Sequence, residues 1–274
     1  MRILMTTDGS SRSESALRFC AQLASRAGEP LTILTVIEHT RDRPPPQADV
    51  ILSDACNILG MQDVRTRVRI GRPADEILSE IEEGNYDLVI LGKNRAHTWL
   101  ALFFRGSTVV NVAKHAHIPV MVVRGHVCPI LRVMLCDSGG GVTPILSRLT
   151  TQLPDLLKGD EEITILHVMS QISAGPGVRG QQLRAGAEEL IETHTPEGEL
   201  LKRDIKVIER PDANLVPKVL HGLVVDEILA EARSGDYDLV VIGAHRGKGW
   251  RRFLLDDLAH KIIAYVDRPV LIVR

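Results

Sequence analysis

The chain is poor in aromatic residues and carries almost no net charge. Its 274 residues include only two tryptophans, three tyrosines and four phenylalanines, and the formal net charge is −2. Binding of nucleic acid relies on a basic face, and binding of single strands also uses aromatic rings on which bases stack. The sequence offers neither feature, so we expect no nucleic acid among the partners of this protein.

Long apolar runs are also missing. The uncharged apolar stretches have the length of strands, shorter than the roughly 20 residues that a membrane-spanning helix needs. The segment from Met1 to Ser10 reaches Asp8 before the apolar core of a signal peptide could form. We therefore expect a cytoplasmic protein that has no membrane partner.

Cysteine is scarce and shows no CxxC pairing, which argues against a structural zinc site or a disulfide framework. In a cytoplasmic protein such cysteines are reduced thiols. The apolar share of the composition is 44%, and with so few aromatic rings the core must be aliphatic. The four cysteines are Cys20, Cys56, Cys128 and Cys136.

Short apolar strands alternate with amphipathic helices along the first half. Ser10 or Ser11 can cap a first helix that ends at Gly28, and further helices are predicted at Ala48–Leu59, at Ala74–Glu83 and up to about His115. This alternation predicts an α/β fold with a parallel sheet covered by helices on both faces. The predicted strands are Arg2–Thr7, Leu31–Ile37, Val64–Ile70, Asp87–Leu91 and Val120–Val123.

The same pattern then starts again, which indicates a duplicated domain. The segment starting at Asp226 repeats DEIL from Asp75, and the one starting at Tyr237 repeats YDLV from Tyr86, each 151 residues later. Two tandem domains are therefore predicted, over residues 1–125 and 130–274. The second copy is longer, and we expect its extra residues in a loop near Ser173–Gly180 and, in larger part, in Pro211–Gly222, between the third strand and the next helix.

One stretch of the first copy has the features of a phosphate cradle. Gly92 directly follows a buried strand, so backbone N–H groups there could approach an anion closely. Gly106, Ser107 and Thr108 stand at the start of a helix, where hydroxyls and the positive end of the helix dipole favour negative charge. We expect both segments at the carboxyl edge of the sheet, where open parallel sheets bind their ligands.

Both halves resemble the universal stress protein family. The resemblance rests on the Asp8-Gly9-Ser10 turn, the segment from Gly71 to Ile77, the strand from Tyr86 to Gly92, the Gly106-Ser107 pair and the final Pro-Val-x-Val-Val-Arg strand. It implies tandem five-stranded parallel sheets with helices on both faces, an adenine nucleotide alpha hydrolase-like fold. It also implies an internal pseudo-dimer paired through Val120–Val123 and Val270–Val273, and two such chains could associate as a homodimer.

By this resemblance, the first domain would bind ATP or AMP, with Mg²⁺ only as the companion of ATP. The adenosine would lie near the first two strands, and the phosphates would lie on the loop after the fourth strand. The residues implied are Thr7, Asp8, Val36, Leu91, Gly92, Asn94, Arg95, Gly106, Ser107 and Thr108.

The chain departs from the family's glycine pattern at Arg95. The nucleotide-binding members have a second glycine at this position. Their spacing from this glycine to the next one is one residue shorter than the spacing from Arg95 to Gly106 here. The long side chain could keep the backbone away from a phosphate, or the guanidinium of Arg95, with Arg105 nearby, could pair with the phosphate directly. Both alternatives follow from the sequence.

The second domain departs further, and a degenerate site is predicted there. Asp137 and Gly243 correspond to Asp8 and Gly92, but Asp256 and Asp257 replace the Gly-Ser pair and would repel an anion. They could hold a metal, although acidic residues at a helix start are the more frequent reason for such a pair. Likewise, residues 139–141 form either an anion nest or a loose turn, and His115-x-His117 marks a helix end more often than a metal site.

Three functions are consistent with these patterns. The first is a stress-response protein that binds or senses an adenine nucleotide through domain 1 and acts by ligand-dependent interaction with a protein partner, without catalysis. The second is a nucleotide-free scaffold that binds a partner or an apolar ligand between its lobes. The third is a weak ATPase, which the sequence favours least because it has neither a Walker lysine nor a clear general base.

Overall fold

The computed structural model describes residues 1–38, 48–92, 108–125, 129–137, 143–157, 160–169, 185–206, 214–243 and 259–274. The chain divides into two compact units. The first unit comprises Met1–Pro129 and Leu153–Leu156, and the second comprises Ile130–Gln152 and Leu157–Arg274. Within the described ranges, no helix is both long enough and apolar enough to cross a membrane.

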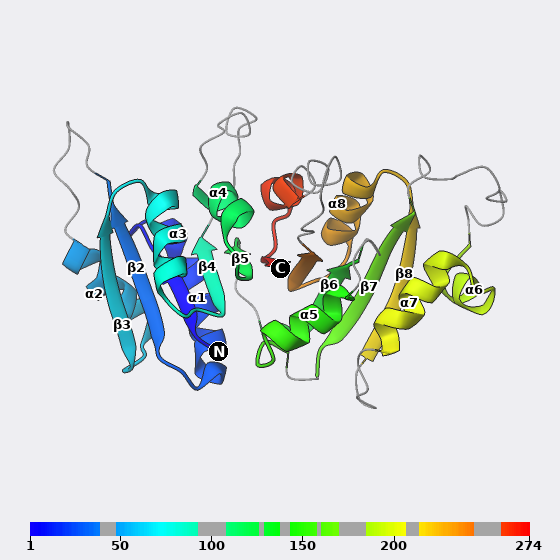
Figure 1. The fold of residues 1–274 in the computed structure, drawn as a ribbon, viewed down its shortest axis with the longest axis horizontal. Coiled ribbons are helices and arrows are strands. Elements are labelled where there is room, and N and C mark those ends of the chain that lie inside the picture. Colours follow the sequence, from blue (N-terminus) through cyan, green and yellow to red (C-terminus); the bar gives the residue numbers. More distant parts are fainter. Residues whose placement is uncertain are drawn as a thin grey trace. The chain divides into compact units, whose positions relative to one another are not determined.

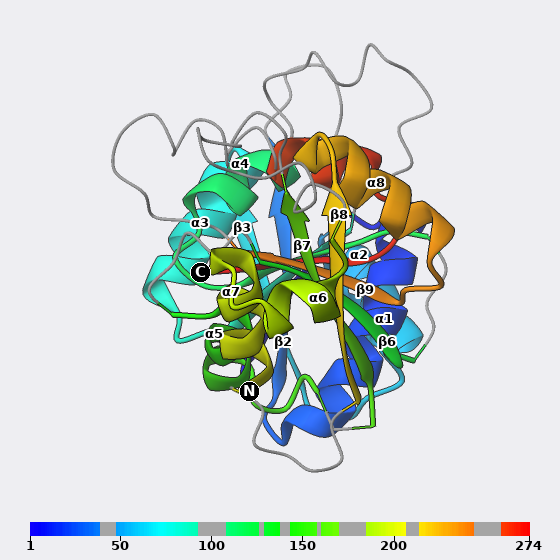
Figure 2. The same ribbon diagram turned by 90° about the vertical axis from the view of Figure 1, so that its right-hand side faces the viewer.

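The first unit contains a parallel sheet with strands in the order β3-β2-β1-β4-β5. Helices α1 and α2 pack together on one face, and α3 and α4 pack together on the other (Figures 1 and 2). This arrangement confirms the predicted α/β class, and most of the predicted ends are right to within one residue. The elements are β1 Ile3–Thr6, α1 Ser11–Ala27, β2 Leu31–Ile37, α2 Ala48–Leu59, β3 Val64–Ile70, α3 Pro73–Glu83, β4 Leu88–Gly92, α4 Thr108–His115 and β5 Val120–Val123.

Burial explains this strand order. The first three residues of β1 and the first four of β4 are buried, as expected for central strands covered on both faces. The edge strand β3 instead exposes Arg65 and Arg67, together with Val68 and Ile70. Charged side chains along an edge discourage pairing with another chain. The sequence of β3 is therefore suited to the edge.

The second unit repeats the arrangement with strands in the order β8-β7-β6-β9-β10, all parallel. Within this unit, α5 and α7 contact each other on one face of the sheet, and α8 lies on the other face (Figures 1 and 2). Its elements are β6 Arg132–Cys136, α5 Ile145–Gln152, β7 Glu162–Met169, α6 Ala187–Glu192, α7 Pro196–Lys206, β8 Asn214–His221, α8 Val224–Ser234, β9 Leu239–Gly243 and β10 Val270–Val273.

The expected position of the larger insertion, Pro211–Gly222, is wrong. Most of this segment is strand β8, which pairs with β7 over its whole length, from Asn214 to His221. The extra residues precede β8, in the region that contains α6. Pro217 makes the segment look like a loop, but an edge strand tolerates a proline because one side of its backbone needs no partner strand.

A glutamate–tyrosine hydrogen bond recurs in both units, partly buried in the first and buried in the second. The hydroxyl of Tyr86 donates to Glu80 at 2.8 Å, and that of Tyr237 donates to Glu231 at 2.7 Å. Each carboxylate also pairs with a cation from the neighbouring edge strand, Arg69 at 2.7 Å in one unit and Lys218 at 2.8 Å in the other. These contacts tie the end of α3 or α8 to the strand that follows and to the edge of the sheet.

The turn after β1 depends on a glycine. Gly9 has φ +73°, a conformation that other residues rarely adopt, and a Cβ there would lie 2.8 Å from Cγ1 of Ile51 on α2. The turn therefore allows α2 to pack closely against the start of α1. Gly60 has a similar φ of +64° but has no atoms within 4 Å of the corresponding Cβ position.

Replacing Tyr237 with Phe should lower the free energy of unfolding by about 2 kcal/mol, because a buried carboxylate loses one of its donors. The matched control is Tyr265→Phe, since Tyr265 is 44% exposed whereas Tyr237 is 4% exposed. Urea unfolding followed by circular dichroism measures both changes. Equal unfolding midpoints for the two variants would show that this hydrogen bond contributes nothing to stability.

Replacing Gly9 with Ala should cost more stability than replacing Gly60 with Ala. Both changes force alanine into a left-handed conformation, which costs about 1 kcal/mol, but only Gly9→Ala also crowds Ile51. We expect the difference between the two variants to be at least about 1 kcal/mol in the same unfolding assay. Indistinguishable variants would contradict close packing at this turn.

Candidate functional site

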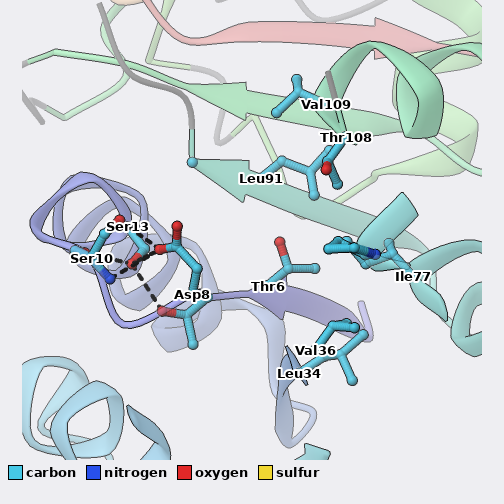
Figure 3. A pocket seen from close by; sticks show the side chains of 13 residues that line it. Thr6, Asp8, Ser10, Ser13, Leu34, Val36, Ile77, Leu91, Thr108 and Val109 are labelled. Carbon is cyan, nitrogen blue, oxygen red and sulfur yellow. Dashed lines mark hydrogen bonds between the residues drawn. The ribbon is translucent and has the colours of Figure 1, made fainter. Parts of the chain in front are cut away.

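A cavity of about 330 Å³ opens in the first unit at the carboxyl ends of β1, β2 and β4 (Figure 3). Six of the residues predicted from the sequence line it together: Thr7, Asp8, Val36, Leu91, Gly92 and Thr108. The other residues of the lining are Thr6, Ser10, Ser13, Leu34, Pro73, Ile77 and Val109.

The strand order explains why a cavity forms at this place. Strands β1 and β4 are neighbours in the sheet, but the chain leaves them for helices on opposite faces, α1 after β1 and α4 after β4. The two connections diverge and leave a crevice above the strand ends, as at the switch point of other open α/β sheets. This is the position at which the sequence predicted a ligand site.

Asp8 forms a network with the hydroxyl groups beside it. Its Oδ1 accepts hydrogen bonds from the backbone N–H of Ser10 at 3.0 Å and from the Ser10 hydroxyl at 2.5 Å. The hydroxyl of Ser13 lies 3.4 Å from the same oxygen, and Thr7 donates to Ser13 at 2.9 Å. The network fixes the orientation of the Asp8 side chain at the mouth of the cavity (Figure 3).

These contacts also set the charge of Asp8. Partial removal from water by itself would raise the pKa of its carboxyl group, but the hydrogen bonds from Ser10 and Ser13 outweigh that effect and lower the pKa below 3.8. The side chain is therefore a carboxylate at neutral pH. The described hydrogen bonds all end on Oδ1, so Oδ2 keeps its capacity to accept a bond from a ligand hydroxyl.

The cap expected at the start of α1 differs from the structure. Ser10 occupies the N-cap position, but its hydroxyl makes no capping hydrogen bond to the helix backbone and donates to Asp8 instead. The backbone N–H of Ser13 donates to the carbonyl of Ser10 at 3.0 Å instead of to its hydroxyl. Ser10 thus belongs to the rim of the cavity.

The opposite wall combines a helix terminus with apolar side chains. Helix α4 begins at Thr108. The Thr108 side chain lines the cavity, and the positive end of the helix dipole lies beside it. Leu34, Val36 and Ile77 supply an apolar surface below it (Figure 3). The cavity therefore combines an apolar floor, an acceptor at one side and a weakly positive helix end at the other.

Four predicted residues, Asn94, Arg95, Gly106 and Ser107, lie outside the described residues, as does Arg105. The two alternatives for Arg95 stay predictions. Sequence reasoning missed Ser13 and Leu34, which periodicity could have indicated. Ser13 lies one helical turn after Ser10, and Leu34 points to the same face of β2 as Val36.

In the second unit, the residues that correspond to Asp8 and Gly92 have different neighbours. Asp137, the counterpart of Asp8, accepts a hydrogen bond from the backbone of Ile145 at 3.2 Å and lies 3.7 Å from the guanidinium of Arg203. A Cβ at Gly243, the counterpart of Gly92, would lie 2.8 Å from the guanidinium of Arg148. Asp256, Asp257 and residues 139–141 are outside the described ranges.

No group of acidic, histidine or cysteine residues in the described part of the chain is arranged to hold a metal ion. Nδ1 of His115 lies 2.9 Å from the backbone carbonyl of Asn111, which agrees with a role at the end of α4. The described cysteines, Cys20, Cys56 and Cys136, are free thiols, and burial raises the pKa of the Cys136 thiol to about 12.

The chain is similar to known proteins along nearly its whole length. The sequence pattern of the universal stress protein family matches residues 1–124 and 153–274. A universal stress protein of Mycolicibacterium smegmatis is 23% identical over 99% of this chain and 96% of its own length.

Two crystal structures share the fold. One is a universal stress protein from Archaeoglobus fulgidus, with a TM-score of 0.64 and 17% identity over 100% of this chain and 96% of that chain. The other is a putative universal stress protein from Pseudomonas aeruginosa, with a TM-score of 0.64 and 16% identity over 99% of this chain and 92% of that chain. Since the family pattern matches most of the sequence, in two segments, the chain belongs to the universal stress protein family as a tandem, two-domain member.

Proposed function

We propose that the first domain binds an adenine nucleotide, ATP or AMP, in the cavity at the ends of β1, β2 and β4. In this proposal the protein is cytoplasmic and acts through ligand-dependent interaction with a partner, without catalysis. The pairing of Val120–Val123 with Val270–Val273 and the association of two chains also remain parts of the proposal.

One observation carries this proposal: residues far apart in the sequence line a single cavity whose chemistry varies along its walls as a nucleotide requires. The apolar floor of Leu34, Val36 and Ile77 suits a base. The Asp8 carboxylate suits a ribose hydroxyl, which needs an acceptor. The start of α4 at Thr108 suits an anionic phosphate.

The same walls support binding better than hydrolysis. The described hydrogen bonds to Asp8 come from the turn that follows β1, so this carboxylate is held in place by Ser10 and Ser13. A bound phosphate would interact with the segment that follows Gly92, which lies outside the described residues. We propose that a partner protein recognises the conformation of that segment.

Calorimetric titration of the purified chain with ATP and with AMP tests the proposal, and mass spectrometry identifies any nucleotide that co-purifies. Asp8→Ala should weaken binding about tenfold or more, because a hydrogen bond to a charged group is lost. Val36→Trp should prevent binding, because a large side chain would fill the space above β2. Phosphate should be released from ATP or AMP no faster with the protein than in buffer alone.

The matched control is Asp63→Ala, which removes an exposed carboxylate from the same domain outside the cavity lining. It should bind like the wild type. Binding at this cavity would be refuted if millimolar nucleotide gave neither heat of binding nor saturation. It would also be refuted if the Asp8, Val36 and Asp63 variants bound nucleotide with equal affinity. Phosphate release that depends on Asp8 would instead favour an ATPase.

A further inference from the structure

Two aspartates of the second unit lie against one guanidinium. Nη2 of Arg203 is 3.2 Å from Oδ1 of Asp204 and 3.7 Å from Oδ2 of Asp137. Both carboxyl groups therefore lie beside the same guanidinium nitrogen, close enough for the charge of Asp137 to act on Asp204. The side chain of Asp204 is 2% exposed and that of Asp137 is 10% exposed. One arginine thus faces two acidic groups that are largely shielded from water.

The cluster joins separate elements of the fold. Asp137 follows β6, and its Oδ2 accepts a hydrogen bond from Ile145, the first residue of α5. Arg203 and Asp204 come from the last turn of α7, which packs on α6, β7, β8 and α5. The contact of Arg203 with Asp137 therefore anchors the end of α7 beside the end of β6.

Other ionisable groups lie on the elements around the cluster. The guanidinium of Arg148 on α5 acts electrostatically on Asp137, and Nδ1 of His167 on β7 lies 3.1 Å from the backbone carbonyl of Asp137. On β8, Lys218 pairs with Glu231, and Nε2 of His221 lies 3.1 Å from the carbonyl of Ala185; on β7, Glu162 pairs with Arg132. Helix α6 contributes Glu188, Glu189 and Glu192, and α7 itself carries Glu197, Glu199, Lys202 and Lys206.

We propose that Asp137 and Asp204 form a proton-dependent latch that holds α7 against the carboxyl end of β6 and loosens as the surroundings become more alkaline. With one proton between them, one carboxyl group donates to the other, and Arg203, together with Arg148 acting on Asp137, balances the remaining charge. When the proton leaves to the solvent, two carboxylates face each other with little water to screen them. Their repulsion favours movement of α7 away from β6.

The acidity of Asp204 puts this change near neutrality. Burial, and then the charge of Asp137, raise its pKa from 3.8 to about 7, against the opposing effect of Arg203. Because the latched form holds a proton that the open form releases, the latch is strongest at low pH and weakens as pH rises toward about 7. From these two pKa values, the equilibrium constant for opening should rise on the order of tenfold between pH 6 and pH 8.

This latch goes beyond nucleotide binding and does not depend on it. Asp137 occupies in the second unit the position that Asp8 occupies at the cavity of the first. The same place in the duplicated fold would thus hold a ligand site in one copy and a pH-sensitive contact in the other.

Hydrogen exchange of the whole chain, corrected for the pH dependence of the chemical exchange rate, tests the latch. Amides of α7 should open about tenfold more often at pH 8 than at pH 6, whereas those of α8 should change little. In Asp204→Asn, which keeps the shape of the protonated acid, the α7 response should disappear. Asp236→Asn is the matched control, since its 90% exposed side chain removes the same charge from the surface.

The Asp236→Asn variant should respond like the wild type. The latch is overturned if hydrogen exchange of α7 in the wild type does not change between pH 6 and pH 8. It is also overturned if the change persists in Asp204→Asn, which would point to another group, such as His167. Carbon-13 NMR of the wild-type carboxyl groups gives an independent result if Asp204→Asn does not fold. A midpoint near pH 7 for Asp204 supports the latch, and a midpoint below pH 5 refutes it.

Discussion

The structure depends on one constraint, which is that each parallel sheet must be covered on both faces. Buried strands such as β5 are apolar on both sides, so the chain has to cross to helices on alternate faces. Where neighbouring strands send the chain to opposite faces, their connections separate. The cavity above β1 and β4 follows from this separation, and its lining consists of whatever residues stand at the strand ends.

The two copies have kept the contacts that hold the layers together but differ at the carboxyl ends of their strands. Both units contain the same glutamate–tyrosine hydrogen bond, between Glu80 and Tyr86 in the first and between Glu231 and Tyr237 in the second. By contrast, Asp8 is engaged by hydroxyl groups of its own turn, whereas Asp137 is engaged by α5 and α7. A duplicated sheet can thus be preserved by its internal packing while its strand ends acquire separate roles.

Asp8 and Asp204 show how surroundings decide the state of the same side chain. Hydrogen-bond donors around Asp8 lower the pKa of its carboxyl group despite partial burial. Around Asp204, burial and a second carboxylate raise the pKa to about 7. The first is a fixed acceptor, and the second responds to proton concentration near neutrality. No property of an isolated aspartate distinguishes them.

The sequence by itself determined the α/β class, the duplication, most strand and helix ends, and six residues of the cavity lining. It could do so because strand alternation, helix periodicity and glycine positions are local patterns, and the ends of parallel strands meet at one edge. The resemblance to the family supplied Thr7, Asp8 and Val36. Only the tertiary structure decided that Pro211–Gly222 contains an edge strand, that Ser10 turns to Asp8, and that Asp204 meets Asp137. Asp137 and Asp204 are far apart along the chain, and packing of α7 on the sheet brings them together, so no local pattern could indicate the contact.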